Sequence, residues 1–123
     1  MNEISVRQSS DLFAVDDPAV VSLLRRIRAS ACEGVRVAEL LRPQDGSRRS
    51  MEMKFRRYLN RSIEDEIRRC RLQHARELLV GTSLSIEAVA EKCGFANTPH
   101  FSRLFKASQG LSQMRYRARF KQP

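Results

Sequence analysis

The chain has 123 residues, of which 41% are hydrophobic and 30% charged, a composition typical of a globular domain with a hydrophobic core. No stretch approaches the ~20 apolar residues of a membrane helix, and no signal peptide is visible. The three cysteines form no Cys-x-x-Cys pair, so neither a disulfide framework nor a zinc knuckle is expected. We therefore predict a reduced, cytoplasmic protein without membrane contact.

The net charge of +9 is unevenly distributed. Residues 1–45 are close to neutral, whereas residues 46–123 contain 17 basic and seven acidic side chains. A basic stretch of this length favours a polyanionic partner, but a solubilising surface explains the charge equally well. Charge alone leaves both interpretations open.

Residues 1–16 show no helical period and are interpreted as a linker or the tail of an upstream domain, so the folded domain is predicted over residues 17–123. Its first helix begins at the capping residue Asp17 and ends at Gly34. A short second helix ends before Pro43.

The third helix begins at the capping residue Ser47, buries Met51 and Phe55, and ends at Asn60, whose side chain tolerates a left-handed backbone. The longest helix follows over residues 62–80. One inner stripe is expected along it, consisting of Ile63, Ile67, Cys70, His74 and Leu78.

Three further helices complete the chain. The first begins at Ser85, the second begins at Asn97 and ends at Gly110, and the third covers residues 111–120. Because no segment alternates with period two, the predicted fold is all-α, with about seven helices.

An internal repeat divides this pattern. At an offset of 50 residues, Ser47 aligns with Asn97, Phe55 with Phe105, and Asn60 with Gly110 (Met51 aligns likewise with Phe101). Each copy contains a short helix, a turn and a capped second helix, which is the helix-turn-helix pattern. We therefore predict two helix-turn-helix subdomains, over residues 17–60 and 82–121, joined by the long helix.

The linking helix has about 19 residues and spans roughly 28 Å at 1.5 Å per residue. Successive major grooves on one face of DNA lie ~34 Å apart. One chain can thus place two recognition helices in adjacent grooves of double-stranded DNA.

The same residues resemble the AraC/XylS-type transcriptional regulators. The resemblance covers about residues 17–121 and rests on five segments: residues 47–55, 71–72, 75–79, 85–95 and 101–110. Two further segments, residues 7–11 and 31–34, resemble the xylose-operon-regulator branch. The chain departs from the family pattern at three places, where Pro, Gly and a small Ala are usual: Gln113, Asn60 and Leu41.

The resemblance implies sequence-specific DNA binding in transcription regulation, with RNA polymerase as a further partner. In the xylose branch the DNA-binding part follows a sugar sensor similar to periplasmic binding proteins. This chain is then expected to be a C-terminal fragment, on which an effector sugar acts only through the upstream part.

Base-reading residues are expected on the exposed faces near the start of each recognition helix, because these positions enter the groove. The candidates are Arg48, Arg49, Glu52, Thr98, Pro99, His100, Ser102 and Arg103. The alternative, that Arg48 and Arg49 contact only phosphate, stays open. Arg103 is the strongest single candidate for a base contact.

Phosphate contacts are expected from capping residues at helix N-termini and from basic side chains away from the base edges. The candidates are Ser47, Arg56, Arg57, Arg61, Ser62, Ser85, Asn97 and Lys106. Arg68, Arg69 and Arg71 are also basic, but they fit a solvated face of the linking helix equally well.

No catalytic constellation, metal site or cofactor site is expected. The two histidines lie 26 residues apart, and His74 is expected in the core. All three cysteines are interpreted as inert, buried thiols. The alternative function is a basic helical module that binds an acidic protein without DNA specificity; an enzyme is not predicted.

Overall fold

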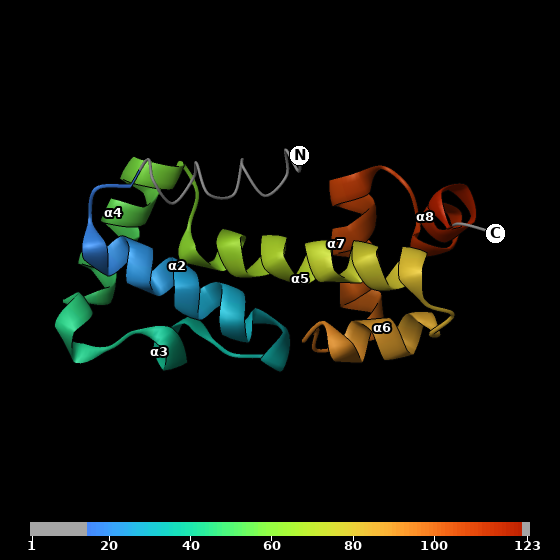
Figure 1. Ribbon diagram of the computed structural model, residues 1–123, viewed down its shortest axis with the longest axis horizontal. Coiled ribbons are helices and arrows are strands. Elements are labelled where there is room, and N and C mark those ends of the chain that lie inside the picture. The colour runs from blue at the N-terminus through green and yellow to red at the C-terminus, as the bar shows by residue number, and fades with distance from the viewer. Residues whose placement is uncertain (1–14, 122–123) are drawn as a thin grey trace.

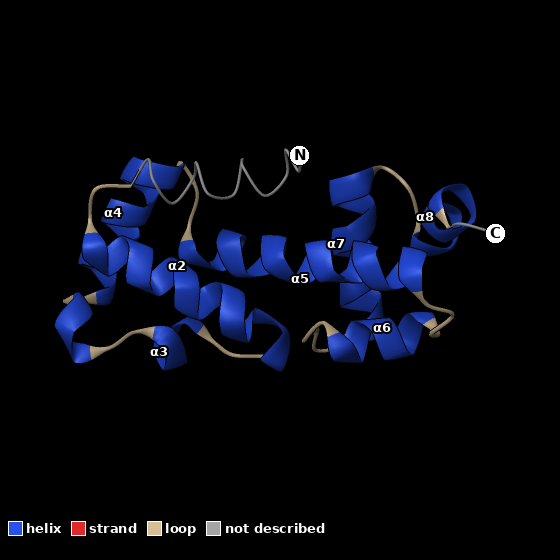
Figure 2. Cartoon of the chain, in the orientation of Figure 1, coloured by secondary structure: helices blue, strands red, loops and turns tan. Residues whose placement is uncertain are grey.

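The computed structural model describes residues 15–121 and is all-α over that part of the chain (Figures 1 and 2). Most of the predicted linker lies outside the described residues. Seven α-helices are found there, as predicted, together with two 3-10 helices, Ala31–Glu33 (η1) and Pro43–Asp45 (η2). The α-helices are α2 (Pro18–Ser30), α3 (Val37–Leu40), α4 (Arg48–Leu59), α5 (Ile63–Gly81), α6 (Ile86–Lys92), α7 (Thr98–Gln109) and α8 (Gln113–Phe120).

Helix capping follows the predicted repeat. The amide of Ser50 donates to Ser47 Oγ at the start of α4, and the amide of His100 donates to Asn97 Oδ1 at the start of α7. Both helices end in a left-handed residue, Asn60 with φ 58° and Gly110 with φ 75°. In each case the amide of the left-handed residue donates to a carbonyl of the last helical turn, and the chain turns sharply. Helices α4 and α7 therefore end in the same way.

The apolar side chains form two separate cores. The first lies among α2, α3, α4 and the first half of α5, and Leu23, Leu24 and Phe55 are fully buried in it. The second lies among α6, α7 and the second half of α5, and Phe101 and Phe105 are fully buried in it. We call α2–α4 the N-terminal helix group and α6–α8 the C-terminal helix group.

Helix α5 serves both cores by burying different faces along its length. Its first half buries Ile63 and Ile67, whereas its second half buries Leu72, Ala75 and Leu79. From residue 67 to residue 72 the buried direction turns about 140°, at 100° per residue. The single inner stripe predicted for this helix is therefore wrong beyond its first half.

His74 lies on the side of α5 that the second core leaves uncovered. Its side chain is 41% exposed and its Nδ1 lies 3.4 Å from Glu77 Oε1. The prediction that His74 packs in the core is wrong, because it assumed one continuous buried stripe.

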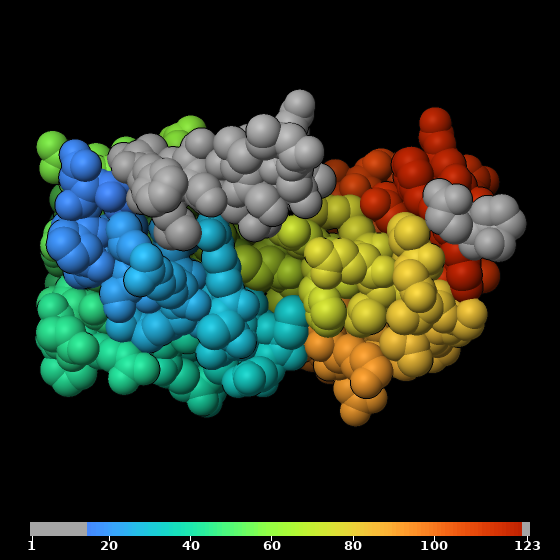
Figure 3. Space-filling model, viewed as in Figure 1, coloured from blue at the N-terminus to red at the C-terminus, as the bar shows by residue number. Residues whose placement is uncertain are grey.

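Helices α4 and α7 lie across opposite ends of α5, and in Figure 1 both begin at the lower edge of the molecule and end at the upper edge. The chain thus presents two similarly directed helices at the two ends of one connecting rod. The two groups meet beside α5, with the blue-to-green surface on one side and the orange-to-red surface on the other (Figure 3). None of the described helices is long and apolar enough to cross a membrane.

Candidate nucleic-acid interface

Helix α4 has one buried face and one exposed face that is basic. Met51 and Phe55, one turn apart, are fully buried in the first core. The exposed side chains of α4 include Arg49, Met53, Arg56 and Arg57 on the opposite face, and Arg48 at the start of the helix. Four of these five carry a positive charge, as an interface with a polyanion requires.

Helix α7 repeats this arrangement. Phe101 and Phe105 are buried, and the exposed row consists of Pro99, His100, Arg103, Lys106 and Ala107. Residues 101–110 show the same succession of buried, half-buried and exposed side chains as residues 51–60. Over these ten residues the two helices therefore present equivalent faces, whereas their first three residues differ in exposure.

Met53 is a residue of this face that the sequence analysis did not select. It is 65% exposed and occupies the position of Arg103 in the other copy. Met53 therefore places one apolar side chain among the arginines of this face. The 50-residue offset was the signal that could have identified it.

Glu52 and Ser102, both predicted to read bases, are half-buried and have partners within the chain. Glu52 Oε1 accepts a 3.3 Å hydrogen bond from the Ile63 amide, and Ser102 Oγ accepts a 2.8 Å bond from Gln113 Nε2. The two pairs are equivalent in the repeat. Each ties a recognition helix to the start of the following helix.

Gln113 stands where the resembling family usually has Pro. It is the first residue of α8 and is 5% exposed, so its amide lies inside the second group. The equivalent residue of the first copy is the buried Ile63. The second copy therefore has a hydrogen-bonded amide where the first copy has a buried apolar side chain.

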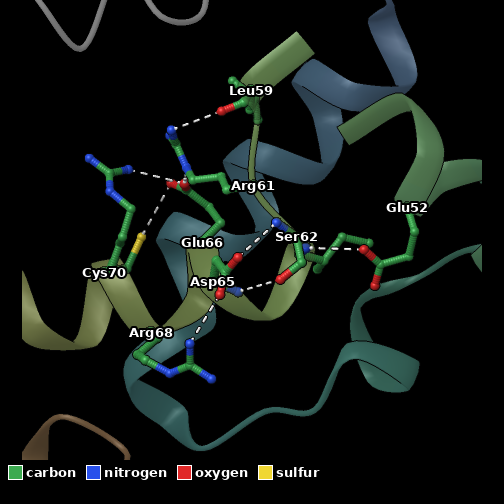
Figure 4. Close-up of polar contacts among 10 residues, drawn as sticks. Glu52, Leu59, Arg61, Ser62, Asp65, Glu66, Arg68 and Cys70 are labelled. Carbon is green, nitrogen blue, oxygen red and sulfur yellow. Dashed lines mark hydrogen bonds and ion pairs between the residues drawn. The ribbon is translucent and has the colours of Figure 1, made fainter. Parts of the chain in front are cut away.

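The junction between α4 and α5 is built on a buried carboxylate, Glu66, which is 1% exposed (Figure 4). Arg61 Nε donates to it over 2.5 Å and Arg69 Nη1 over 3.1 Å. Arg61 also donates to the Leu59 carbonyl at 3.3 Å. Breaking one side of a buried ion pair leaves an uncompensated charge, so this cluster holds the end of α4 against α5.

Arg61 is therefore engaged inside the protein rather than presented to a ligand. Its side chain is 23% exposed, much less than those of the arginines on α4. The predicted phosphate contact assumed that Arg61 is a free surface charge. It did not take into account the ion pair with Glu66, which lies in the first turn of α5.

The N-terminus of α5 is likewise occupied. The Ser62 amide donates to Asp65 Oδ2, and the Asp65 amide donates back to Ser62 Oγ, both at 3.0 Å (Figure 4). The hydrogen bond from the Ser62 amide is the main cause that lowers the pKa of Asp65, so this carboxylate stays charged. Two further acidic residues, Glu64 and Glu66, lie in the same turn. A phosphate would meet negative charge here, unlike at Ser47 or Asn97.

The remaining capping candidates are exposed. Ser47, Ser85 and Asn97 each accept one amide at the start of a helix, and the first turns that follow Ser47 and Asn97 contain no acidic residue. A helix N-terminus favours an anion, although Glu87 lies in the first turn that follows Ser85.

A cavity of about 570 Å³ lies between the starts of α4 and α7. Arg48 contributes from α4, His100 from α7, and Arg68 and Arg71 from α5 (Arg36 lies on its rim). Arg68 is partly neutralised by Asp65 at 3.0 Å, and Arg48 lies 3.8 Å from Glu64. The hollow between the two exposed faces is therefore basic, although acidic side chains also line it.

Arg71 is not part of a solvated face. Its Nε donates to the Ala31 carbonyl at 2.7 Å and its Nη2 donates to the Val35 carbonyl at 3.0 Å. Burial lowers the pKa of Arg71, but two carbonyl acceptors replace the lost water. Arg71 thus fastens the middle of α5 to the N-terminal group.

Residues 45–119 match the family of helix-turn-helix domains. The xylose operon regulatory protein of Escherichia coli is 32% identical over 111 residues, which are 90% of this chain and 28% of that protein. The chain thus spans less than a third of this relative's length.

Two solved structures are also similar. The structure of the xylose-binding transcription activator xylR superposes with a TM-score of 0.77 at 30% identity, over 89% of this chain and 29% of that one. An AraC-type DNA-binding domain of Chromobacterium violaceum gives 0.76 at 30% identity, over 86% of this chain and 95% of that one. With its repeated caps and equivalent exposed faces, the chain belongs to the AraC/XylS-type family of helix-turn-helix DNA-binding domains.

Proposed function

We propose that the chain binds double-stranded DNA with α4 and α7 in two successive major grooves on one face of the duplex. The main support is that α4 and α7 present similar exposed, basic faces at opposite ends of the 19-residue helix α5. That helix spans roughly 28 Å. Adjacent major grooves lie ~34 Å apart, slightly more than the length of this helix. A slight bend of the DNA brings the two grooves close enough for both helices to enter them.

Within this proposal, base edges are read by side chains in the first two turns of each recognition helix. In α4 these are Arg48, Arg49 and Met53, and in α7 they are Thr98, Pro99, His100 and Arg103. Arginine pairs with two acceptors of guanine, and an apolar side chain contacts a thymine methyl group. Met53 and Arg103 thus give equivalent positions different base preferences.

Phosphate contacts are assigned to Arg56, Arg57 and Lys106 later in the recognition helices, and to the exposed caps Ser47, Ser85 and Asn97. These contacts set position and orientation without reading sequence. Glu52, Ser102, Arg61 and Ser62 instead hold the recognition helices in place through their internal hydrogen bonds.

We further propose that the whole protein regulates transcription in the cytoplasm in response to a sugar. The support is the similarity to proteins named for xylose regulation. Because the chain spans only 28% of the Escherichia coli relative, sugar binding is assigned to a part outside the chain. RNA polymerase is the expected protein partner of such a regulator.

Titration of salt against duplex affinity tests the proposal. With roughly six to ten phosphates neutralised, affinity should fall on the order of a thousandfold or more between 50 and 200 mM salt. A flat salt response would overturn the groove-binding arrangement and favour a module that binds an acidic protein. The matched control is Arg25→Ala, which removes an exposed arginine of α2 outside both recognition helices and outside the cavity between them.

A further inference from the structure

Two cysteines from different helix groups meet at the side of α5. Cys32 lies in η1 of the N-terminal group and is half-buried against the second core. Cys93 follows the last residue of α6, belongs to that core and is fully buried. These thiols are 61 positions apart in the sequence.

The backbones that bear them are in close contact. A Cβ atom placed on Gly94 would lie 3.0 Å from the Ala31 oxygen and 3.0 Å from the carbonyl carbon and oxygen of Cys32. Gly94 has a φ of 86°, so only a residue without a side chain fits both the turn and the approach. The residue next to Cys93 therefore rests directly on the backbone of Cys32.

The two sulfur atoms are chemically unequal. The neighbouring Cys93 side chain is the largest cause that lowers the pKa of Cys32 to about 7, and Cys32 in turn raises the pKa of Cys93. His74 and Arg71 lower the pKa of Cys32 further through their electrostatic effect, whereas burial and Glu77 raise it. One sulfur is thus a thiolate over much of the neutral range, and its neighbour keeps its proton.

Small molecules can reach Cys32 from solvent. A cavity of about 420 Å³ opens beside it, lined by Cys32, Cys70, Arg28 and His74. A second cavity of about 480 Å³ reaches Cys32 from the side of Arg71. Both cavities contain basic side chains, together with Glu66 and Glu77 in the first and Glu33 and Glu91 in the second.

We propose that Cys32 and Cys93 form a modification site that reacts with a hydroperoxide and becomes a disulfide joining the two helix groups. The Cys32 thiolate attacks a peroxide oxygen, the O–O bond breaks, and Cys32 becomes a sulfenic acid while hydroxide leaves as water after protonation. Cys93 sulfur then attacks Cys32 sulfur, the S–S bond forms, the S–O bond breaks, and the hydroxyl leaves as water with the Cys93 proton. Two thiols and one hydrogen peroxide give one disulfide and two water molecules.

Cys70 is not the second partner. Burial raises its pKa to about 11, and its Sγ lies 3.9 Å from Glu66 Oε2. The disulfide instead joins η1 to the turn that leads into α7. Such a bond would fix the orientation of α7 relative to the N-terminal group independently of α5.

The test treats the reduced chain with hydrogen peroxide in the absence of DNA, so its outcome does not depend on the proposed function. The expected result is a mass loss of about two hydrogen atoms, a Cys32–Cys93 peptide after digestion, and a rise of about 5 °C or more in Tm that a reductant reverses. Cys70→Ser should behave like the parent.

A second variant separates the two steps. In Cys93→Ser the reaction should stop at the Cys32 sulfenic acid, which dimedone captures, and no disulfide should form. If the parent chain gains oxygen at Cys32 without forming the bridge, or if the digest shows Cys32 joined to Cys70, the proposal is overturned.

Discussion

Replacing Phe105 with Ala should remove a large part of the stability of the domain. The side chain is fully buried, its ring lies 5.8 Å from that of Phe101 and 5.3 Å from that of Tyr116, and both contacts are T-shaped. Truncation of a buried Phe costs about 3–5 kcal/mol. Two lost aromatic pairs, each worth about 0.5–1.5 kcal/mol, place this site in the upper part of that range.

A domain of this size has a total stability of about 5–15 kcal/mol, so the loss should lower Tm by well over 10 °C. Urea unfolding followed by circular dichroism measures it. The milder Phe105→Leu should lose less, and Ala107→Ser, at an exposed position of the same helix, should unfold like the parent. A Phe105→Ala chain within about 1 kcal/mol of the parent would refute the alignment of the two copies and the packing derived from it.

Three further results are expected. Arg103→Ala should cost roughly 1–3 kcal/mol of binding free energy on a selected duplex and relax the preference at one or two base pairs. Arg56→Ala should instead weaken the affinity for all sequences alike and reduce the slope of affinity against salt by about one. If Arg103→Ala weakened binding to every duplex variant by a common factor, Arg103 would be a phosphate contact. Met53→Ala should change preference at one base pair while leaving the salt slope unchanged, and a changed slope would contradict an apolar base contact. Alkylation of Cys32 by iodoacetamide should accelerate as pH rises through about 7, since its lowered pKa favours the thiolate above that pH, whereas Cys70, with its pKa of about 11, should stay slow; equal pH profiles would contradict the thiol assignment.

Local chemistry explains why the helices and the repeat could be predicted from the sequence. Caps such as Ser47 and Asn97 bond to amides three residues away, and the stop at Asn60 requires only the tolerance of one residue for positive φ. The spacing of Met51 and Phe55 likewise identifies the buried face of α4. Each of these signals lies within one or two helical turns.

The errors lie where distant segments meet. Whether His74 is buried depends on which side of α5 each core occupies. Helical periodicity does not show on which side a core lies. Arg71 bonds to a carbonyl 40 residues away, and the contact of Cys32 with Cys93 spans the two groups. The ion pair of Arg61 with Glu66 was also missed, because Glu66 looks in the sequence like an ordinary first-turn acid.

The central claim is that one chain holds two recognition helices at a fixed separation. The most direct measurement compares affinity for a selected duplex with affinity for the same duplex carrying five extra base pairs between the two half-sites. Half a helical turn moves the second groove to the opposite side of the DNA, and α5 is too short and too firmly fastened by Arg71 to follow it. The affinity should fall to that of a single half-site; equal affinity for both duplexes would contradict the claim.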